Sequence, residues 1–399
     1  MATSNSCNTD AKIESASRPK AMSGSFDSFG GQGDFRKHDA TFASRPPCRV
    51  FNILSEGTYR NMGYAPCGPF WHRLKRIVTT QLFSPAVYAS HEPIRRKEIH
   101  YMLKVLVEDS HKGKKSGESL IGNIFLDDRD IVSLVVGLLN AGTDASANTV
   151  EWAMAELMAN PDIRKKAQAE LDAVVQDRLV QESDIPNLPF LQAIVKENYR
   201  MHPSAPLSVR HESHEPCVIS GCEFPALTEL IMNIFAIHRD PSVYENPDKF
   251  DPTRFVRSPE VDPVAGNDFY QLMRFGAGRR MCPGQQLGNT MVTSMLANLL
   301  QCFEWETATS ERESGGGGGD EVGVDIANHY SFINYRQKPL YLLTKPPRLA
   351  SLLQPTLAII LFLSTPQQIL FSDGFTSSLL SLFLSYLGIV VVVVTVGRI

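Results

Sequence analysis

This sequence of 399 residues contains few cysteines and has almost balanced numbers of acidic and basic residues. The seven cysteines are an odd number and are scattered, which argues against a secreted disulfide framework and favours a reducing compartment. The 43 acidic and 39 basic residues give a net charge of −4, too even to indicate nucleic acid or an anionic membrane as partner. No apolar run precedes Phe51, so we expect neither a signal peptide nor an N-terminal anchor.

Three zones of composition divide the chain. Residues 1–41 are rich in Ser, Gly, Asn, Asp and Lys without periodic apolar positions, and we expect a disordered arm there. Residues 42–349 carry the globular signals, and a chain with 43% hydrophobic residues can bury a sizeable core. In residues 350–399 the composition becomes strongly apolar.

Within that last zone, residues 379–396 form an uncharged, mostly apolar run of 18 residues, just long enough to cross a bilayer. The run is at the short limit, its valines favour strands, and an apolar tail can also arise from an aberrant reading frame. The sequence leaves both a transmembrane segment and a non-native tail open. An inserted tail would anchor the globular part at its C-terminus.

Apolar periodicity predicts a mainly α fold with a minor β-sheet region. Residues 128–158 repeat apolar positions at helical spacing, which predicts a long, largely buried helix. A second helix is predicted to begin at Pro161, with Asn160 as its cap, and to run to about Gln176. The other predicted elements are a helix over residues 190–201, a strand over residues 227–237 and a helix over residues 287–302.

The stretch FGAGRRMCPGQQLG sets one cysteine among glycines and arginines. Pro283 favours a helix start, which places Cys282 at the helix N-cap or just before it, where the helix dipole favours a thiolate. Gly276 lets the backbone come close to a flat ligand, and Arg280 adds positive charge for a carboxylate. A lone cysteine is usually a buried small hydrophobe, but this pattern predicts a soft, anionic metal ligand beside an anion-binding arm.

This stretch resembles the signature loop of the cytochromes P-450, the haem-thiolate monooxygenases. The resemblance implies a cytochrome P-450 fold with haem b (iron protoporphyrin IX) as cofactor. It also implies that Cys282 is the axial ligand of the haem iron and that Arg280 binds a haem propionate. Phe275 and Gly276 would belong to the same cofactor-binding loop.

Further motifs of the family occur in the family's order. Glu197 and Arg200 lie three positions apart on one helix face, so their side chains can pair. In the family such a pair forms a buried network with a later arginine, and FDPTRF supplies Arg254 at the matching place. Residues 225–241 resemble the strand and turn between those motifs.

Haem propionate contacts are implied at three more positions. Trp71 matches the tryptophan of a family helix, and Lys75 stands where the family usually has a second, basic contact, an arginine. The charge is kept there while the bidentate fork is lost. Arg210 matches another propionate contact, and together with FASRPP at Phe42 the motifs look most like plant microsomal members.

The long helix carries the family's oxygen-activating motif in modified form. Residues 141–144 (AGTD) interrupt its apolar interior, although a mid-helix glycine costs about 1 kcal/mol relative to alanine. The resemblance implies a groove for dioxygen beside Thr143, with Asp144 helping proton delivery. The family's usual hydroxyl residue is Ala145 here, so Ser146 or a water would have to take its place.

The chain is short for this family. Trp71 and Ala141 are 70 positions apart, less than half the expected separation. We therefore expect the helices that roof the substrate pocket to be missing near residues 110–125, which leaves the fold incomplete. The resemblance covers residues 42–349. A pocket without its roof admits water, and dry surroundings keep a haem oxidant selective.

Two functional hypotheses follow. The first is a monooxygenase that takes electrons from an NADPH-dependent cytochrome reductase and inserts one oxygen atom of O2 into a small lipophilic or phenolic substrate. The resemblance places it in plant secondary metabolism, on the cytosolic face of the endoplasmic reticulum membrane. The second is a truncated, catalytically inactive haem-binding protein, which the missing roof and Ala145 favour.

Overall fold

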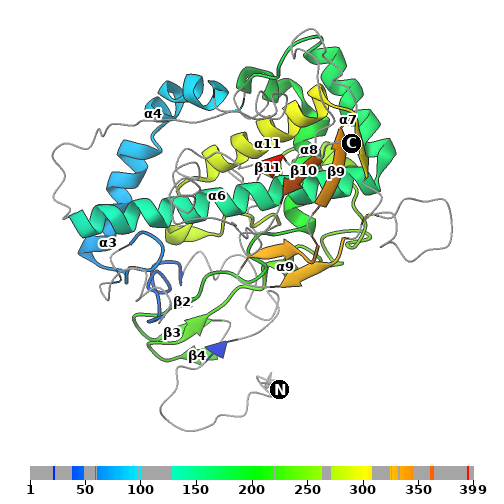
Figure 1. Cartoon of the computed structure of the whole chain (residues 1–399). Helices are drawn as coiled ribbons and strands as arrows, with labels where there is room; N and C mark the ends of the chain where they lie inside the picture. Colours follow the sequence, from blue (N-terminus) through cyan, green and yellow to red (C-terminus); the bar gives the residue numbers. More distant parts are fainter. Residues whose placement is uncertain are drawn as a thin grey trace, which may run out of the picture.

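The computed structural model describes the following residues of the chain: 21–22, 38–48, 59, 61–97, 99, 128–219, 222–262, 271–307, 324, 326–330, 333–338, 340–344, 360–363 and 393–394. Helices dominate this part, and the strands form small sheets (Figure 1). The mainly helical fold class with a minor sheet component is confirmed.

The described residues form one long helix and several shorter ones. They are α3 (Pro69–Ile77), the π-helical segment η2 (Val78–Leu82), α4 (Pro85–Ser90), α6 (Asp128–Ala159), α7 (Pro161–Val174), α8 (Pro189–Met201), α9 (Ile234–Ile237), α10 (Thr253–Arg257) and α11 (Gln285–Cys302), with 3-10 turns η3 (Glu182–Asn187) and η4 (Gly278–Arg280).

The strands pair in sheets of two to four. They are β1 (Ala21–Met22), β2 (His211–Glu212), β3 (Cys217–Ile219), β4 (Cys222–Phe224), β5 (Glu229–Leu230), β6 (Trp305–Thr307), β7 (Asn328–Tyr330), β8 (Asn334–Arg336), β9 (Leu340–Thr344), β10 (Ile360–Leu363) and β11 (Val393–Val394). Their orders are β1-β5-β2, β11-β10-β9-β6, β3-β4 and β7-β8. Two residues of the predicted N-terminal arm thus pair in parallel with β5, with Ala21 opposite Glu229.

The main core forms around the C-terminal half of α6. The predicted helix over residues 128–158 is confirmed, because α6 runs to Ala159. It packs against α7, α8 and α11, and Figure 1 shows α11 running above it. The predicted helix over residues 190–201 is also confirmed, because α8 spans the same residues and begins only one residue earlier. Shared core residues of these helices include Val150, Met154, Leu157, Leu171, Leu191, Ile194, Leu296 and Leu300.

The expected side-chain cap of α7 is wrong. Asn160 occupies the cap position, but its Nδ2 donates to the carbonyl oxygen of Glu156, 2.9 Å away, at the end of α6. Pro161 is the first residue of α7, so the predicted start of this helix is confirmed although its side-chain cap is not. The amide therefore closes the preceding helix instead.

The strand predicted over residues 227–237 is largely wrong. Only Glu229–Leu230 pair, as β5, and Ile234–Ile237 form the short helix α9. The side chain of Asn233 accepts a hydrogen bond from the backbone N–H of Ala236 at 3.0 Å. This N-cap contact starts a helical turn where the apolar alternation indicated a strand.

The helix after the cysteine is confirmed, but the helix start predicted at Pro283 is wrong. α11 begins at Gln285 with Gly284 at the N-cap, so Pro283 lies in the preceding turn. The Gly284 carbonyl accepts the first helical bond, from Gly288 N at 2.8 Å. Cys282 consequently lies two positions before the cap.

The predicted membrane segment, residues 379–396, lies outside the described residues except for Val393–Val394. These two residues form β11 and pair with β10. Within the described ranges, no helix has both the length and the apolar character needed to cross a bilayer.

Candidate functional site

The loop before α11 closes on itself and presents the thiol of Cys282. The backbone N–H of Cys282 donates to the carbonyl oxygen of Phe275 at 2.9 Å, and the Cys282 side chain is exposed. Gly276 and Gly278 have φ of 72° and 68°, in the left-handed region that disfavours other residues. The two glycines therefore make this tight turn possible.

Opposing influences act on the Cys282 thiol. Desolvation by surrounding protein atoms is the largest and raises its pKa, while a hydrogen bond from the Gly284 backbone and the charge of Arg274 lower it. The net direction is upward, so the expected preference for a thiolate does not hold for the chain alone, whose cysteine lies before the helix cap. A bound metal cation would supply the positive charge that deprotonates such a thiol.

Three residues predicted to contact haem propionates meet at the Trp71 ring. The Arg280 guanidinium lies 3.9 Å from the ring centroid, and Lys75 Nζ lies 5.2 Å from it. Lys75 Nζ also donates to the carbonyl oxygen of Arg279 at 2.5 Å. Trp71 itself is buried, and its Nε1 donates to the carbonyl oxygen of Met62 at 3.2 Å. α3 and the cysteine loop thus share a cationic cluster.

Backbone carbonyls hold Arg280 in this position. Its guanidinium donates to Ala43 O at 2.7 Å, Ala65 O at 2.6 Å and Met62 O at 3.4 Å. Burial, and secondarily the charge of Arg45, lower the pKa of Arg280 to about 9. Neutral carbonyls orient the cation but leave its charge uncompensated.

A further buried cation of the site, which the sequence motifs did not indicate, is Arg45 of the FASRPP stretch. The side chain is buried and donates to Gly63 O at 3.1 Å, Val209 O at 3.1 Å and Arg210 O at 2.7 Å. Burial lowers its pKa to about 10. Arg210, the remaining predicted propionate contact, pairs through its own side chain with Glu229 at 3.3 Å. The available signal was an arginine between apolar residues and prolines.

The modified motif of α6 is open on one side. Ala141 and Gly142 are exposed, and a Cβ placed on Gly142 would meet no atom within 4 Å. Thr143, Asp144 and Ser146 are half-buried.

Asp144 has a partner that the sequence did not indicate. Burial raises the pKa of its carboxyl, and a side-chain hydrogen bond with Tyr335 of β8 lowers it by less. The pKa of Tyr335 is raised to about 12, first by burial and then by Asp144. The partner comes from a strand almost 200 positions away, which periodicity alone does not bring to α6.

The predicted network of Glu197, Arg200 and Arg254 is present in the structure. Arg200 Nε and Nη2 each donate to a Glu197 carboxylate oxygen at 2.8 Å, and Arg254 Nε donates to Glu197 Oε1 at 3.1 Å. Glu197 and Arg200 are fully buried. Arg200 also donates to the carbonyl oxygens of His238 and Pro247 at 2.9 and 2.6 Å, so the network fixes the loops beside α8.

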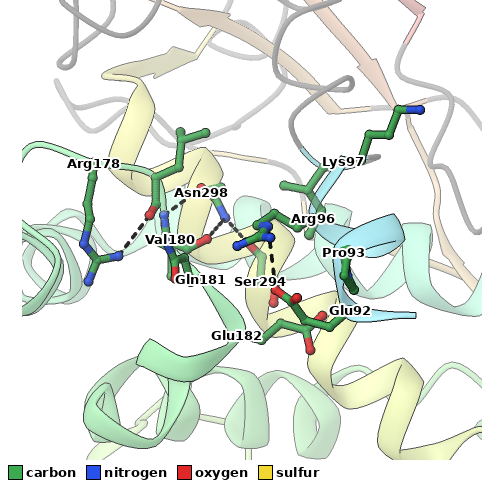
Figure 2. A pocket seen from close by; sticks show the side chains of 12 residues that line it. Glu92, Pro93, Arg96, Lys97, Arg178, Val180, Gln181, Glu182, Ser294 and Asn298 are labelled. Carbon is green, nitrogen blue, oxygen red and sulfur yellow. Dashed lines mark hydrogen bonds and ion pairs between the residues drawn. The ribbon is translucent and has the colours of Figure 1, made fainter. Parts of the chain in front are cut away.

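A cavity of about 490 Å³ lies further along α11, away from the cysteine loop. Figure 2 shows Ser294 and Asn298 of α11 facing the segment around Val180, and Asn298 Nδ2 donates to the Val180 carbonyl oxygen at 3.2 Å. Ser294 lies nine positions, roughly 13 Å of helix, beyond the first residue of α11. This cavity therefore belongs to a different part of the molecule from Cys282.

Comparison with known proteins agrees with this arrangement. Residues 120–315 match the family model of cytochrome P-450. The chain belongs to the cytochrome P-450 family. A zebrafish cytochrome P-450 with abiraterone aligns with a TM-score of 0.62 and 18% identity over 79% of this chain and 90% of that chain, which supports the cytochrome P-450 fold.

Sequence relatives of this cytochrome P-450 are plant enzymes. It is 47% identical over 208 residues to flavonoid 3',5'-hydroxylase CYP75B138 of Crocosmia x crocosmiiflora, covering 51% of this chain and 38% of the relative. It is 50% identical over 273 residues to flavonoid 3',5'-hydroxylase 2 of Petunia hybrida (64% and 51%) and 45% identical over 225 residues to flavonoid 3'-monooxygenase of Arabidopsis thaliana (55% and 42%). The chain spans about half or less of the length of these relatives.

Membership of the cytochrome P-450 family implies a haem with a thiolate ligand, and the residues of this chain fit such a group. The exposed Cys282 thiol supplies a sulfur ligand, and the adjacent loop uses glycines at positive φ. Within the described residues, the hydrogen bonds that hold Arg45 and Arg280 go to backbone carbonyl oxygens, so their positive charges are available to carboxylates. The fit extends from the sulfur to the propionates.

Proposed function

We propose that the chain is a haem-thiolate monooxygenase in which Cys282 binds the iron of haem b. The observation that carries the proposal is the placement of an exposed thiol on a closed loop, beside the cationic cluster that this loop shares with α3. Arg280 and Lys75 would bind one propionate over the Trp71 ring, and Arg210 would bind the other. Residues 42–349 would form the haem domain, with residues 350–399 as a hydrophobic tail.

The chain's own residues would prepare the site for oxygen chemistry, while the haem, when bound, would supply the activation of O2. Cys282 would donate electron density to the iron, which favours cleavage of the O–O bond. Asp144 would take part in proton delivery to the haem site, with its carboxyl oriented by the side-chain hydrogen bond with Tyr335. Ser146 or a water would provide the hydroxyl that Ala145 lacks, and Thr143 would line the same groove.

The substrate class we infer is a small phenolic compound of the flavonoid type. The support is the set of relatives named as flavonoid hydroxylases, which are 45–50% identical to this chain in the matched regions. One oxygen atom of O2 would enter a C–H bond of the substrate and the other would leave as water. Two electrons would come from NADPH through a cytochrome reductase on the cytosolic face of the endoplasmic reticulum.

An inactive haem-binding protein is the second candidate, and Ala145 together with the short spacing between Trp71 and Ala141 favours it. The two candidates are separated by reconstituting the haem-loaded chain with a plant NADPH–cytochrome reductase, NADPH and a flavanone. The monooxygenase predicts a product heavier by one oxygen atom, detected by mass spectrometry and absent for Cys282→Ser. Haem binding with NADPH oxidation but no oxygenated product contradicts the monooxygenase and supports the second candidate.

A further inference from the structure

Arg274 is a cation beside the cysteine loop that no function described above uses. Its side chain is half-buried, and its Nε is shielded from solvent without a hydrogen-bond partner. Within the described ranges, no carboxylate pairs with it or contributes to its pKa, which burial lowers. A charge in such surroundings without an acidic partner raises the free energy of the folded chain, so the contacts that fix the guanidinium must offset this cost.

Three structural elements fix the Arg274 guanidinium. Nη2 donates to Thr149 Oγ1 of α6 at 3.0 Å. The carbon Cζ lies 5.0 Å from the centroid of the Tyr199 ring of α8 and 5.2 Å from that of Phe275 in the cysteine loop. Rings at these distances attract a cation through their negative faces. The charge therefore has a defined place between α6, α8 and the loop.

That place adjoins the loop that holds the Cys282 sulfur. Arg274 directly precedes Phe275, whose carbonyl oxygen accepts the backbone hydrogen bond of Cys282 at 2.9 Å. The guanidinium also lies beside the Phe275 ring, so the charge stays at the loop. Because the Arg274 Nε is shielded from solvent, salt screens this charge less than a charge on the surface.

We propose that Arg274 is a positioning residue that holds a permanent positive charge beside the Cys282 sulfur. This charge draws electron density away from the thiolate and stabilises a bound haem in its reduced, ferrous state, because that state carries one more electron. The inference rests on the proposed function, since it requires haem bound through Cys282. It assigns Arg274 the control of the reduction potential, one of the ways in which a protein tunes a haem.

The test is a spectroelectrochemical titration of the haem-loaded full chain and of Arg274→Gln and Arg274→Lys. A unit charge within ~10 Å at an effective dielectric of about 20 changes such an equilibrium about tenfold. We expect Arg274→Gln to lower the ratio of ferrous to ferric haem about tenfold at a fixed potential, equivalent to about 59 mV for one electron. Arg274→Lys keeps the charge and should recover most of the ratio. An unchanged potential in Arg274→Gln overturns the proposal.

Two further variants separate charge from a general structural role. Arg279→Gln removes a charge from the same loop, but Arg279 is exposed and its Nε lies 3.4 Å from Asp39 Oδ2, so the potential should stay unchanged. Thr149→Val removes the hydrogen bond that orients Arg274 and should lower the potential by less than Arg274→Gln. It should have no further effect in the Arg274→Gln background. An equal shift in Arg279→Gln, or fully additive shifts, contradicts the proposal.

A reduced carbon monoxide spectrum of every sample distinguishes the two ways of failing. A wild-type chain without the thiolate-type band overturns the proposed function and this inference with it. A wild-type chain with the band and an Arg274→Gln potential equal to its own overturns only the role of Arg274. If Arg274→Gln does not retain haem, the comparison of wild type, Arg274→Lys and Thr149→Val decides, and equal potentials in all three contradict the proposal.

Discussion

Arg200 shows how one buried side chain determines the structure of a loop region. Its guanidinium satisfies the buried carboxylate of Glu197 and also reaches the carbonyl oxygens of His238, Pro247 and Lys249. The pairing at three-residue spacing could be predicted from sequence, because helix geometry alone brings the two side chains together. The carbonyl contacts could not, because they depend on loops without periodic signals.

We expect Arg200→Met to lower the free energy of unfolding by about 3–5 kcal/mol, because among the described residues it leaves the buried Glu197 carboxylate with Arg254 as its one charged partner. Arg178→Met is the matched control, since the Arg178 side chain is 44% exposed in its ion pair with Asp184. That loss should stay below about 1 kcal/mol. Urea denaturation measures both, and equal losses would contradict the assigned burial.

His238 makes stability depend on pH. Its Nε2 accepts a hydrogen bond from Met273 N at 2.9 Å, and burial, aided by the charge of Arg200, lowers its pKa from 6.5 to about 3. Between these values the unfolded chain binds a proton that the folded chain does not. Stability therefore falls as the pH drops below about 6.5, by about 1.4 kcal/mol per pH unit for this group.

His238→Gln tests this dependence, because its amide oxygen can accept the same hydrogen bond from Met273. Urea denaturation at pH 7 and pH 5 should show a smaller pH slope for the variant than for the wild type. Some slope should remain, since burial also lowers the pKa of His211 to about 3. An identical slope in both proteins would mean that His238 does not stay neutral in the folded chain.

At the scale of elements, α6 and α8 could be predicted because long apolar periodicity specifies a buried helix. The strand over residues 227–237 was mispredicted because one capping side chain, Asn233, decided the local structure. The cationic cluster at Trp71 was predicted from motifs, but Arg45 was not, since its partners are carbonyls of distant segments. Contacts of the main chain leave little trace in residue types.

Gly142 provides a prediction for α6. A Cβ there meets no atom within 4 Å, so Gly142→Ala should raise the free energy of unfolding by about 0.5–1 kcal/mol through helix propensity. Gly276→Ala is the contrast, because the space is open there too but φ is 72°. It should lower stability by roughly 1–2 kcal/mol. A loss of stability in Gly142→Ala, followed by chemical denaturation, would contradict the open surroundings assigned to this position.

At the scale of the whole molecule, a chain that matches its plant relatives over about half of their length or less contains the elements that surround the cysteine loop. Helix α3 contributes to the cationic cluster, α6 carries the modified oxygen motif, and α8 carries the buried ion pair. Helix α11 follows the cysteine loop. The segment where the roof helices were expected to be missing, near residues 110–125, lies outside the described residues. Haem ligation and turnover are therefore separate questions, and ligation comes first.

The most direct measurement is the reduced carbon monoxide difference spectrum of the purified, haem-reconstituted chain, compared with Cys282→Ala and Cys67→Ala. We expect the long-wavelength Soret band of a thiolate-ligated haem in the wild type, its loss in Cys282→Ala and its retention in Cys67→Ala, because Cys67 lies half-buried near His72 instead of in the loop. A wild type without this band, or a Cys282→Ala variant that keeps it, would contradict the assignment of Cys282 as the iron ligand.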